Sequence, residues 1–332
     1  MQLTDPASRP TEVSTYRPAL AAFAGVAAAW VFLLITLGAF TTSINAGMAF
    51  PDWPLSNGSL DPRGWLSNLS MFAEHAHRLS AGVMTILTLA LAVWIWVADR
   101  REWLRRLALA ALILVILQAV VGGLRVLLQP DEVVSIDTSV GQLFAMLHAC
   151  LAQAFVCVLI ALALACSQSW IRRPCPVSRR LRRWGVVCCA LLFVQLGIAA
   201  VMRHSFAGLA IPFFPWSGPG HRLLPLIWGF KVGINFAHRI MALILAVSLP
   251  ALAVLVWRDR GASPAMRLAA GLLVALIALQ IVLGASIILT FRDPAVTTAH
   301  VVVGAITLAT TFWLTWIAHR DAIEGSPAGE ET

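Results

Sequence analysis

The chain has 332 residues, of which 59% are hydrophobic and only 12% are charged, and its mean hydropathy is +0.82. A soluble domain is usually about 45–50% apolar, so this composition excludes an ordinary soluble protein and indicates a membrane protein. The net charge of +8 does not indicate nucleic-acid binding, because the basic residues form short clusters between long apolar runs, as they do in membrane proteins.

Apolar stretches of about 20 residues, which are long enough to cross a hydrocarbon core of about 30 Å, occur along the whole chain. The first follows a polar tail without a small-residue cleavage site, so we predict a retained helix and not a signal peptide. The sequence therefore predicts an all-α integral membrane protein with eight transmembrane helices. In chain order they cover residues 19–42, 75–97, 107–128, 140–166, 184–203, 232–257, 267–290 and 296–318.

Clusters of arginine predict the orientation of the chain, because short cytoplasmic loops carry an excess of Lys and Arg. Most basic residues lie in the tails and in the links 98–106, 167–183 and 258–267, whereas the link at 130–137 is acidic. We therefore expect both termini in the cytoplasm. We also expect a multi-pass protein of a bacterial-type plasma membrane, in contact with lipid and not with nucleic acid.

An internal repeat runs through the sequence. Four landmarks in the same order indicate internal duplication, and we predict two pseudo-symmetric four-helix bundles. The landmarks are Leu-Gly followed by Ala-Gly-x-Ala-x-Pro (37–54 and 196–215), Ala-His-Arg (His77 and His238), Gln-x-x-x-Gly (Gln118 and Gln280) and one later histidine each (His148 and His300).

The repeat divides the chain into five segments. The N-terminal four-helix half covers residues 19–166 and the C-terminal half covers 184–318. A cytoplasmic tail (1–18) precedes them, a basic cytoplasmic linker (167–183) joins them, and a second cytoplasmic tail (319–332) follows.

Four histidines are expected at one depth in the membrane, two or three turns from its outer surface: His77, His148, His238 and His300. Polar side chains in the apolar zone are costly, and they mark functional sites by default. The other four have weaker positions, because His204 and His221 fall in an outer loop, His319 lies at the cytoplasmic end and His75 points away from the face of His77.

A pair of histidines in each half is better suited to haem than to zinc. Zinc would need four ligands, and no cysteine or second carboxylate is expected at this level. Haem iron needs two axial imidazoles between apolar walls, so we expect one haem in each half. Arg78 and Arg239 either pair with haem propionates or extend to the membrane interface. Gln118 and Gln280 are weaker candidates for haem contact.

These motifs, taken in order over residues 19–318, resemble haem A synthase, the COX15/CtaA family. The resemblance implies an eight-helix membrane oxidoreductase that oxidises a methyl group of haem O to the formyl group of haem A for cytochrome oxidase assembly. It implies that His77 and His148 face the substrate haem, that His238 and His300 ligate the iron of haem b, and that Glu74 is the catalytic carboxylate. Haem O synthase and an electron donor are the implied partners.

One departure from the family concerns cysteine. Many bacterial members carry a cysteine pair in the first outer loop, whereas the positions that look equivalent here hold Ala49 and Ser56. The six cysteines of this chain are expected within helices or on the cytoplasmic side, where disulfides rarely persist. We therefore expect them to be small packing residues.

Glu74 separates the two copies of the repeat, because Asn235 replaces it in the second. Residues three apart share a helix face, so Glu74 is expected beside the haem of His77, where a carboxylate can transfer a proton or stabilise positive charge. Two alternatives remain at this point. A quinone-linked di-haem b-type electron carrier needs four histidines but has no evident need for Glu74, and a transporter built from repeats would place its polar residues near the midplane.

Overall fold

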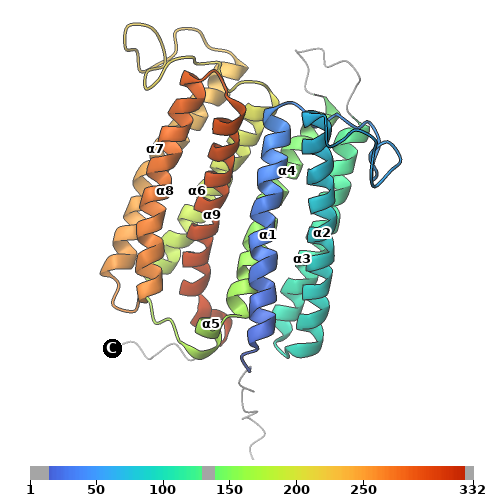
Figure 1. The fold of residues 1–332 in the computed structure, drawn as a ribbon. Helices are drawn as coiled ribbons and strands as arrows, with labels where there is room; N and C mark the ends of the chain where they lie inside the picture. Colours follow the sequence, from blue (N-terminus) through green and yellow to red (C-terminus); the bar gives the residue numbers. More distant parts are fainter. Residues whose placement is uncertain (1–14, 129–138, 326–332) are drawn as a thin grey trace, which may run out of the picture.

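The computed structural model describes residues 15–128 and 139–325, and within them the chain forms ten α-helices and no β-strand. Two helices are short, α5 (Gln168–Arg172) and α10 (Arg320–Ile323). The other eight are long and apolar enough to cross a membrane, which confirms the predicted spans and identifies a multi-pass membrane protein (Figure 1). They are α1 (Pro18–Ser43), α2 (Leu69–Ala98), α3 (Glu102–Leu127), α4 (Val140–Ala165), α6 (Arg179–His204), α7 (Phe230–Arg258), α8 (Pro264–Leu289) and α9 (Pro294–Ala318).

Capping side chains determine where several helices begin. Asn68 accepts hydrogen bonds from the backbone of Ser70 and Met71 at the start of α2, and Ser139 forms a capping box with Gln142 at the start of α4. Such caps satisfy N–H groups that have no partner inside the helix. Helices α2 and α6 therefore begin before the apolar stretches that predicted them, within polar residues.

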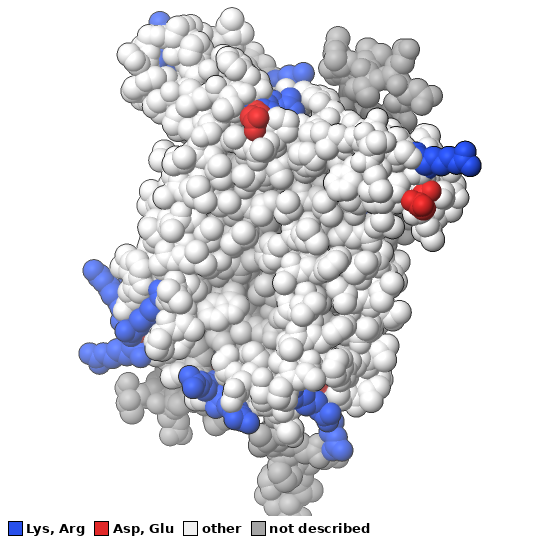
Figure 2. Space-filling view, in the orientation of Figure 1, with Lys and Arg blue, Asp and Glu red and all other residues white. Residues whose placement is uncertain are grey.

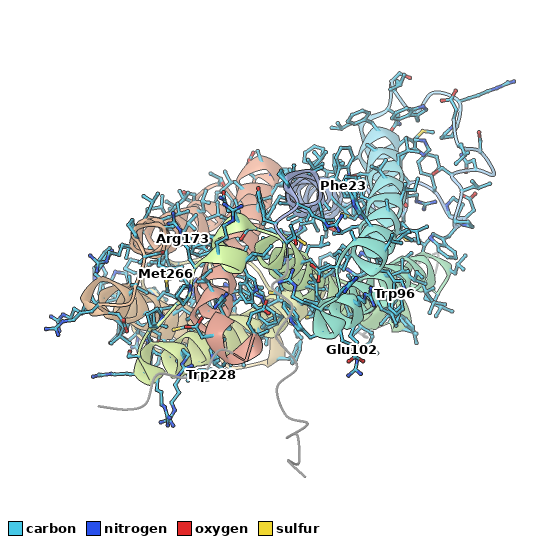
Figure 3. All side chains as sticks on the ribbon, turned by 90° about the horizontal axis from the view of Figure 1, so that it is seen from below. Phe23, Trp96, Glu102, Arg173, Trp228 and Met266 are labelled. Carbon is cyan, nitrogen blue, oxygen red and sulfur yellow. The ribbon has the colours of Figure 1, made fainter. Side chains whose placement is uncertain are left out.

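The eight long helices form two sets of four, α1–α4 and α6–α9, which stand side by side (Figure 1). They meet where α1 and α4 pack against α9, and α4 also packs against α6. Seen along the helices, Phe23, Trp96 and Glu102 lie towards one side of the molecule and Met266 towards the other (Figure 3). Helix packing between the sets therefore involves mainly the helices nearest the centre, α1, α4, α6 and α9.

The described chain begins and ends at the same end of the molecule, here called the termini end (Figure 1). Lys and Arg gather there, and the flanks of the face shown are almost free of charge (Figure 2). The opposite end, here called the loop end, carries the long connections 44–68 and 205–229. The predicted acidic link and the outer parts of both tails (1–14, 129–138 and 326–332) lie outside the described residues.

The main hydrophobic cluster fills the half of the molecule nearer the termini end. Buried Leu, Ala, Val and Ile from all eight long helices pack there, and Trp170 of the linker, which is fully buried, closes the cluster. The half nearer the loop end contains the buried Glu74, His75 and Asn235. The cluster includes residues between 20 and 31 of α1, 84 and 95 of α2, 104 and 115 of α3, and 245 and 256 of α7.

Side chains from three distant segments meet at the termini end. The Trp170 indole donates to Glu324 Oε1 (2.5 Å), and Arg101 donates to the same oxygen (3.0 Å) as well as to Asp99 (2.8 Å). Burial and the charges of Asp99 and Glu324 act on the pKa of Arg101 in opposite directions, and the two carboxylates prevail and raise it. Glu324, within the segment predicted as a C-terminal tail, thus packs on the linker.

Candidate functional site

The four membrane histidines lie at one level in the loop-end half, as predicted. His77, His148 and His238 each stand eight residues after the first residue of α2, α4 and α7, and His300 stands six residues after the first residue of α9. All four helices begin at the loop end, so each histidine is about two turns below it. The hydrophobic cluster lies beyond them, towards the termini end.

Three of the four imidazoles lie directly against the backbone of a neighbouring helix at a glycine. A side chain larger than hydrogen at these glycines would collide with the imidazole or press on it, so glycine leaves the space that the ring occupies. The distances from an added Cβ to the ring Cε1 are 2.7 Å for Gly38 and His77, 3.0 Å for Gly122 and His148, and 3.4 Å for Gly284 and His300.

Glutamines join three of the histidine helices to their neighbours. The Nε2 atoms of Gln118 and Gln280 donate to the backbone oxygens of His148 (3.2 Å) and His300 (3.0 Å). Gln195, which the comparison of the two repeats did not identify, donates in the same way to the backbone oxygen of His238 (3.2 Å). A lone glutamine in an apolar span was the signal that could have identified it.

Several imidazole nitrogens of these histidines have no hydrogen-bond partner among the described groups. Within the described residues, the buried Nδ1 atoms of His77, His238 and His300 have no hydrogen-bond partner, which is rare for buried polar atoms in proteins. The Nδ1 of His148 instead lies 3.1 Å from the backbone oxygen of Gln118. Each of the four imidazoles therefore has a ring nitrogen that makes no described hydrogen bond to another side chain.

The rings of His238 and His300 lie close together, with their planes tilted by 59°. Their centroids are 6.5 Å apart, close to the sum of two metal–nitrogen bonds of about 2 Å each and the two ring radii. The described residues contain no group of three or more His, Cys, Asp or Glu that could hold a metal ion. Two imidazoles in this arrangement suit a metal whose remaining ligands come from a macrocycle, as in haem.

Glu74 and Arg78 fasten the loop between α1 and α2 to the histidine level. Glu74 is 4% exposed; its Oε2 accepts from the backbone of Phe50 (3.1 Å) and its Oε1 from Arg78 Nη2 (2.5 Å). Arg78 also donates to the backbone oxygens of Asp52 (2.7 Å), Leu55 (2.5 Å) and Phe50 (3.1 Å). The described hydrogen bonds of Arg78 thus run to the loop and to Glu74.

Asn235 and Arg239 make the corresponding contacts between α6 and α7. The Asn235 amide donates to the backbone oxygen of Ala207 (2.9 Å) and accepts from Arg239 Nε (3.1 Å). Arg239 then donates to the backbone oxygens of Trp216 (3.0 Å) and Ile211 (2.8 Å). A neutral amide therefore fastens this loop without a carboxylate.

The loop between α1 and α2 is also ordered by its own polar groups. Burial disfavours ionisation of Asp52, but the backbone N–H groups of Gly58 and Asn57 hydrogen-bond to the carboxylate and lower its pKa. His75, which is buried, lies 2.9 Å from Ser56 Oγ and 3.1 Å from the backbone oxygen of Leu60. His75 therefore positions the loop.

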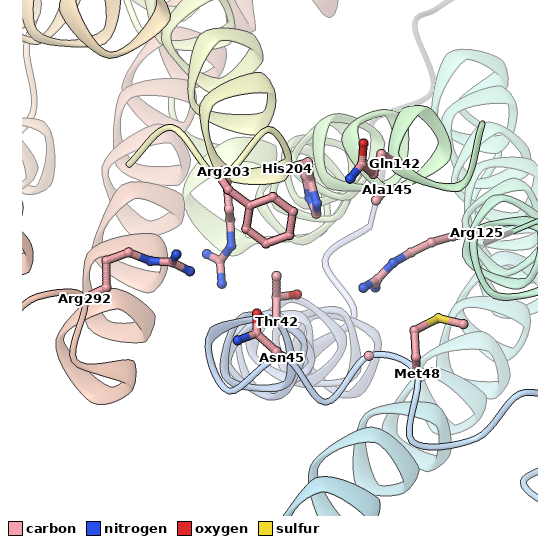
Figure 4. Close-up of a pocket in the computed structure, with 11 residues that line it drawn as sticks. Thr42, Asn45, Met48, Arg125, Gln142, Ala145, Arg203, His204 and Arg292 are labelled. Carbon is pink, nitrogen blue, oxygen red and sulfur yellow. The ribbon is translucent and has the colours of Figure 1, made fainter. Parts of the chain in front are cut away.

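A cavity of about 220 Å³ opens at the loop end, where the two sets of helices meet. Arg125 of α3, Arg203 of α6 and Arg292, which follows α8, reach towards it from three sides (Figure 4). His204 also lines it as the last residue of α6, so the prediction that His204 lies in a loop is wrong by one residue, because α6 continues to that position. None of the described residues that line the cavity is acidic.

Comparison with known proteins identifies the family. The COX15-CtaA model, described as a cytochrome oxidase assembly protein, matches residues 67–313. The chain is 26% identical to a "Heme A synthase" of Listeria monocytogenes serotype 4a (strain HCC23), over 81% of this chain and 85% of the relative. It is also 26% identical to a "Heme A synthase" of Geobacillus kaustophilus (strain HTA426), over 82% of each. The protein therefore belongs to the COX15/CtaA family of cytochrome oxidase assembly proteins.

Proposed function

We propose that this protein is a haem A synthase, an oxidoreductase that converts a methyl group of haem O to the formyl group of haem A for cytochrome oxidase assembly. Family membership and the names of the relatives support this function. The observation that carries it to this chain is the difference between Glu74 and Asn235, each of which accepts a hydrogen bond from the arginine four residues later. Among the described residues, the position three before the first histidine of each pair holds a carboxylate in α2 and a neutral amide in α7.

The substrate haem is assigned to His77 and His148, and a resident haem b to His238 and His300. Free ring nitrogens and the glycines beside the rings support both assignments. The recurrence of these contacts in α1–α4 and α6–α9 supports an origin by duplication of a four-helix unit, with halves at 19–166 and 184–318. When bound, the haem iron would supply the redox chemistry of the reaction.

Glu74 is assigned as the catalytic carboxylate. Protons must leave the methyl group as it is oxidised, and a carboxylate close to the macrocycle can accept them. Each Glu74 oxygen accepts one described hydrogen bond, and since a carboxylate oxygen has two lone pairs, capacity for a proton remains. Because Asn235 fastens its loop without a charge, fastening alone does not account for the charge of Glu74.

The membrane is assigned as the bacterial plasma membrane, with both termini in the cytoplasm. The arginines at the termini end support this orientation (Figure 2). The histidine level then lies near the outer surface. Haem O synthase, as the source of the substrate, and an electron donor are the proposed partners.

Extraction of pigment from the purified protein tests the function. The protein is produced in a host that makes haem O but lacks its own haem A synthase, and the acid-extracted haems are separated by chromatography and weighed by mass spectrometry. We expect haem A, or a haem hydroxylated at the methyl group, together with haem b. Unmodified haem O and haem b alone, under air and with reductant, would contradict the proposal and favour an electron carrier.

A further inference from the structure

We propose that the arginine-lined cavity between the two sets of helices binds the propionate carboxylates of the tetrapyrrole held by His77 and His148. In this assignment Arg125, Arg203 and Arg292 are the carboxylate ligands. The proposal rests on the proposed function, because it takes the substrate to be a haem. Beyond that function, the proposal assigns Arg203 of α6 and Arg292, which follows α8, to a substrate site whose other residues belong to α1–α4.

The positive charges of the arginines around the cavity favour binding of an anion. Arg203 Nη2 donates to the backbone oxygen of Ala39 (2.9 Å) and to Ser43 Oγ (3.0 Å). The side chains of Arg125 and Arg292 make no hydrogen bond or ion pair within the part of the chain that the structure describes, although the charge of Glu74 acts on Arg125 at longer range. Three partly buried guanidinium groups repel one another, and an anion among them relieves that repulsion.

The position of the cavity connects it to the first histidine pair. Arg125 follows Gly122 by three residues and Thr42 follows Gly38 by four, and these two glycines contact His148 and His77. Residues three or four apart share a face of a helix, so the faces of α1 and α3 that meet the imidazoles continue into the cavity. The separation along each helix is about one turn, or about 5.4 Å.

The size of the cavity favours a substituent over a whole ligand. Its volume of about 220 Å³ is below the roughly 300–1,000 Å³ of pockets that enclose a small molecule. A carboxylate on a short flexible arm fits such a space, and the planar guanidinium group matches a carboxylate with paired donors. A macrocycle at the histidine level would thus extend only its propionates into the cavity.

The arginines that the sequence suggested for this role are engaged elsewhere. The described hydrogen bonds of Arg78 run to the loop 50–55 and to Glu74, and those of Arg239 run to the loop 211–216 and to Asn235. Binding a propionate would require them to release these oxygens. Arg125 and Arg292 have no such bonds to break.

A binding experiment with an esterified substrate tests the proposal without measuring activity. Full-length protein loaded with haem b, in nanodiscs of neutral phosphatidylcholine, is titrated with haem O and with haem O dimethyl ester, and binding is followed by the Soret absorbance. The neutral lipid excludes an anionic headgroup as the ligand. For the unaltered protein we expect the free acid to bind at least about tenfold more tightly than the ester. The reason is that a hydrogen bond to a charged group contributes enough free energy to change an affinity by about tenfold or more.

Variants then separate the arginines from general effects. Arg125→Gln and Arg292→Gln should each weaken binding of the acid about tenfold and leave binding of the ester unchanged. Arg63→Gln, which removes an exposed charge at the same end, should change neither. Equal binding of acid and ester by the unaltered protein, or equal weakening of both by the variants, would overturn the subsite. If haem A is still formed in that case, the proposed function stands and only the subsite is wrong, whereas failure to bind either form and to make haem A would refute both.

Discussion

At the scale of single residues, Glu74 and Asn235 show how one framework serves two purposes. Each accepts a hydrogen bond from the arginine four residues later, and each binds backbone of the preceding loop. The amide can both donate and accept, and the carboxylate can only accept, so the two loops present opposite groups to them. Phe50 offers an N–H to Glu74, and Ala207 offers a carbonyl oxygen to Asn235.

Replacing Glu74 by Gln tests whether its charge is needed for conversion. The substitution keeps the side-chain volume and one acceptor for Phe50, so we expect haem binding and the thermal unfolding temperature to change little. Conversion of haem O should fall by about 10²–10⁴-fold, the usual contribution of a general acid–base group. The assay is chromatography of extracted haems over time.

Asn235→Asp is the matched control for this substitution. It introduces a carboxylate beside the other histidine pair, and we expect no increase in haem A formation. Haem A formation at the normal rate by Glu74→Gln would instead make Glu74 a structural residue.

Gly38 offers a second test at this scale. An added Cβ would lie 2.7 Å from His77 Cε1, so Gly38→Ala should displace the imidazole and weaken binding of the substrate haem by about tenfold or more. Alanine is about 1 kcal/mol more favourable than glycine within a helix, which offsets part of the cost of moving the imidazole. Haem affinity should therefore fall clearly while the thermal unfolding temperature of the haem-free protein changes little, as measured by haem titration and thermal unfolding.

Gly197→Ala is the control for Gly38→Ala, because an added Cβ there meets nothing within 4 Å. We expect unchanged haem binding. If Gly38→Ala also leaves binding unchanged, the close approach of α1 to His77 has no part in holding the substrate.

At the scale of elements, the linker between α4 and α6 behaves as part of the folded core. Burial, with a smaller contribution from the charge of Asp321, raises the pKa of the Cys175 thiol to about 11. The thiolate is the reactive form of cysteine. We therefore expect Cys175 to react with iodoacetamide at pH 8 at least about tenfold more slowly in the native protein than in dodecyl sulfate, as measured by peptide mass spectrometry.

The raised pKa of Cys175 also makes the free energy of unfolding depend on pH. Because the folded pKa of Cys175 lies above the ordinary value of 9.0, the unfolded chain releases this proton first as the pH rises. The contribution of Cys175 to stability is therefore complete below about pH 9 and decreases as the pH rises towards 11. Cys175→Ala should remove this decrease from a plot of the unfolding free energy against pH.

In the labelling experiment, equal rates of reaction for Cys175 in the folded and unfolded states would show that the linker is open.

The long helices were predictable from the sequence, and their ends were less so. Hydropathy located all eight spans because a length of about 20 apolar residues is required to cross a bilayer. It misplaced the start of α6 at residue 184, since Arg179 to Arg183 are helical, with the Ser178 side chain as their cap. Helices α5 and α10 are too short to show a periodic pattern and were missed.

At the scale of the whole molecule, the distribution of charge predicts the orientation in the membrane. A reporter that is active only in the cytoplasm should work when fused after Arg105, Arg179 or Arg260, since these positions lie at the arginine-rich end. It should fail after Asn57 and after Asp131, of which the latter lies outside the described residues. Activity after Asn57 would reverse the orientation and place the histidines near the inner surface.

The candidate site was predictable only in part. The common level of the four histidines was predictable because each lies at a similar distance along an apolar span from its loop end. It could not identify the cavity, because Arg125, Arg203 and Arg292 lie far apart along the chain and come together only through packing of α1 and α4 on α6 and α9. Nor could it show that Arg78 binds loop carbonyls, since backbone oxygens leave no pattern in a sequence.

The meeting of Arg101, Trp170 and Glu324 has a consequence for how the protein is made. These residues come from the link between α2 and α3, from the linker, and from the segment after the last long helix. Because Glu324 follows the last long helix, Arg101 and Trp170 are synthesised before it. Their hydrogen bonds to Glu324 can therefore form only after α9 has been synthesised. A chain that stops at residue 318 would keep eight spans but leave the Trp170 indole without this partner.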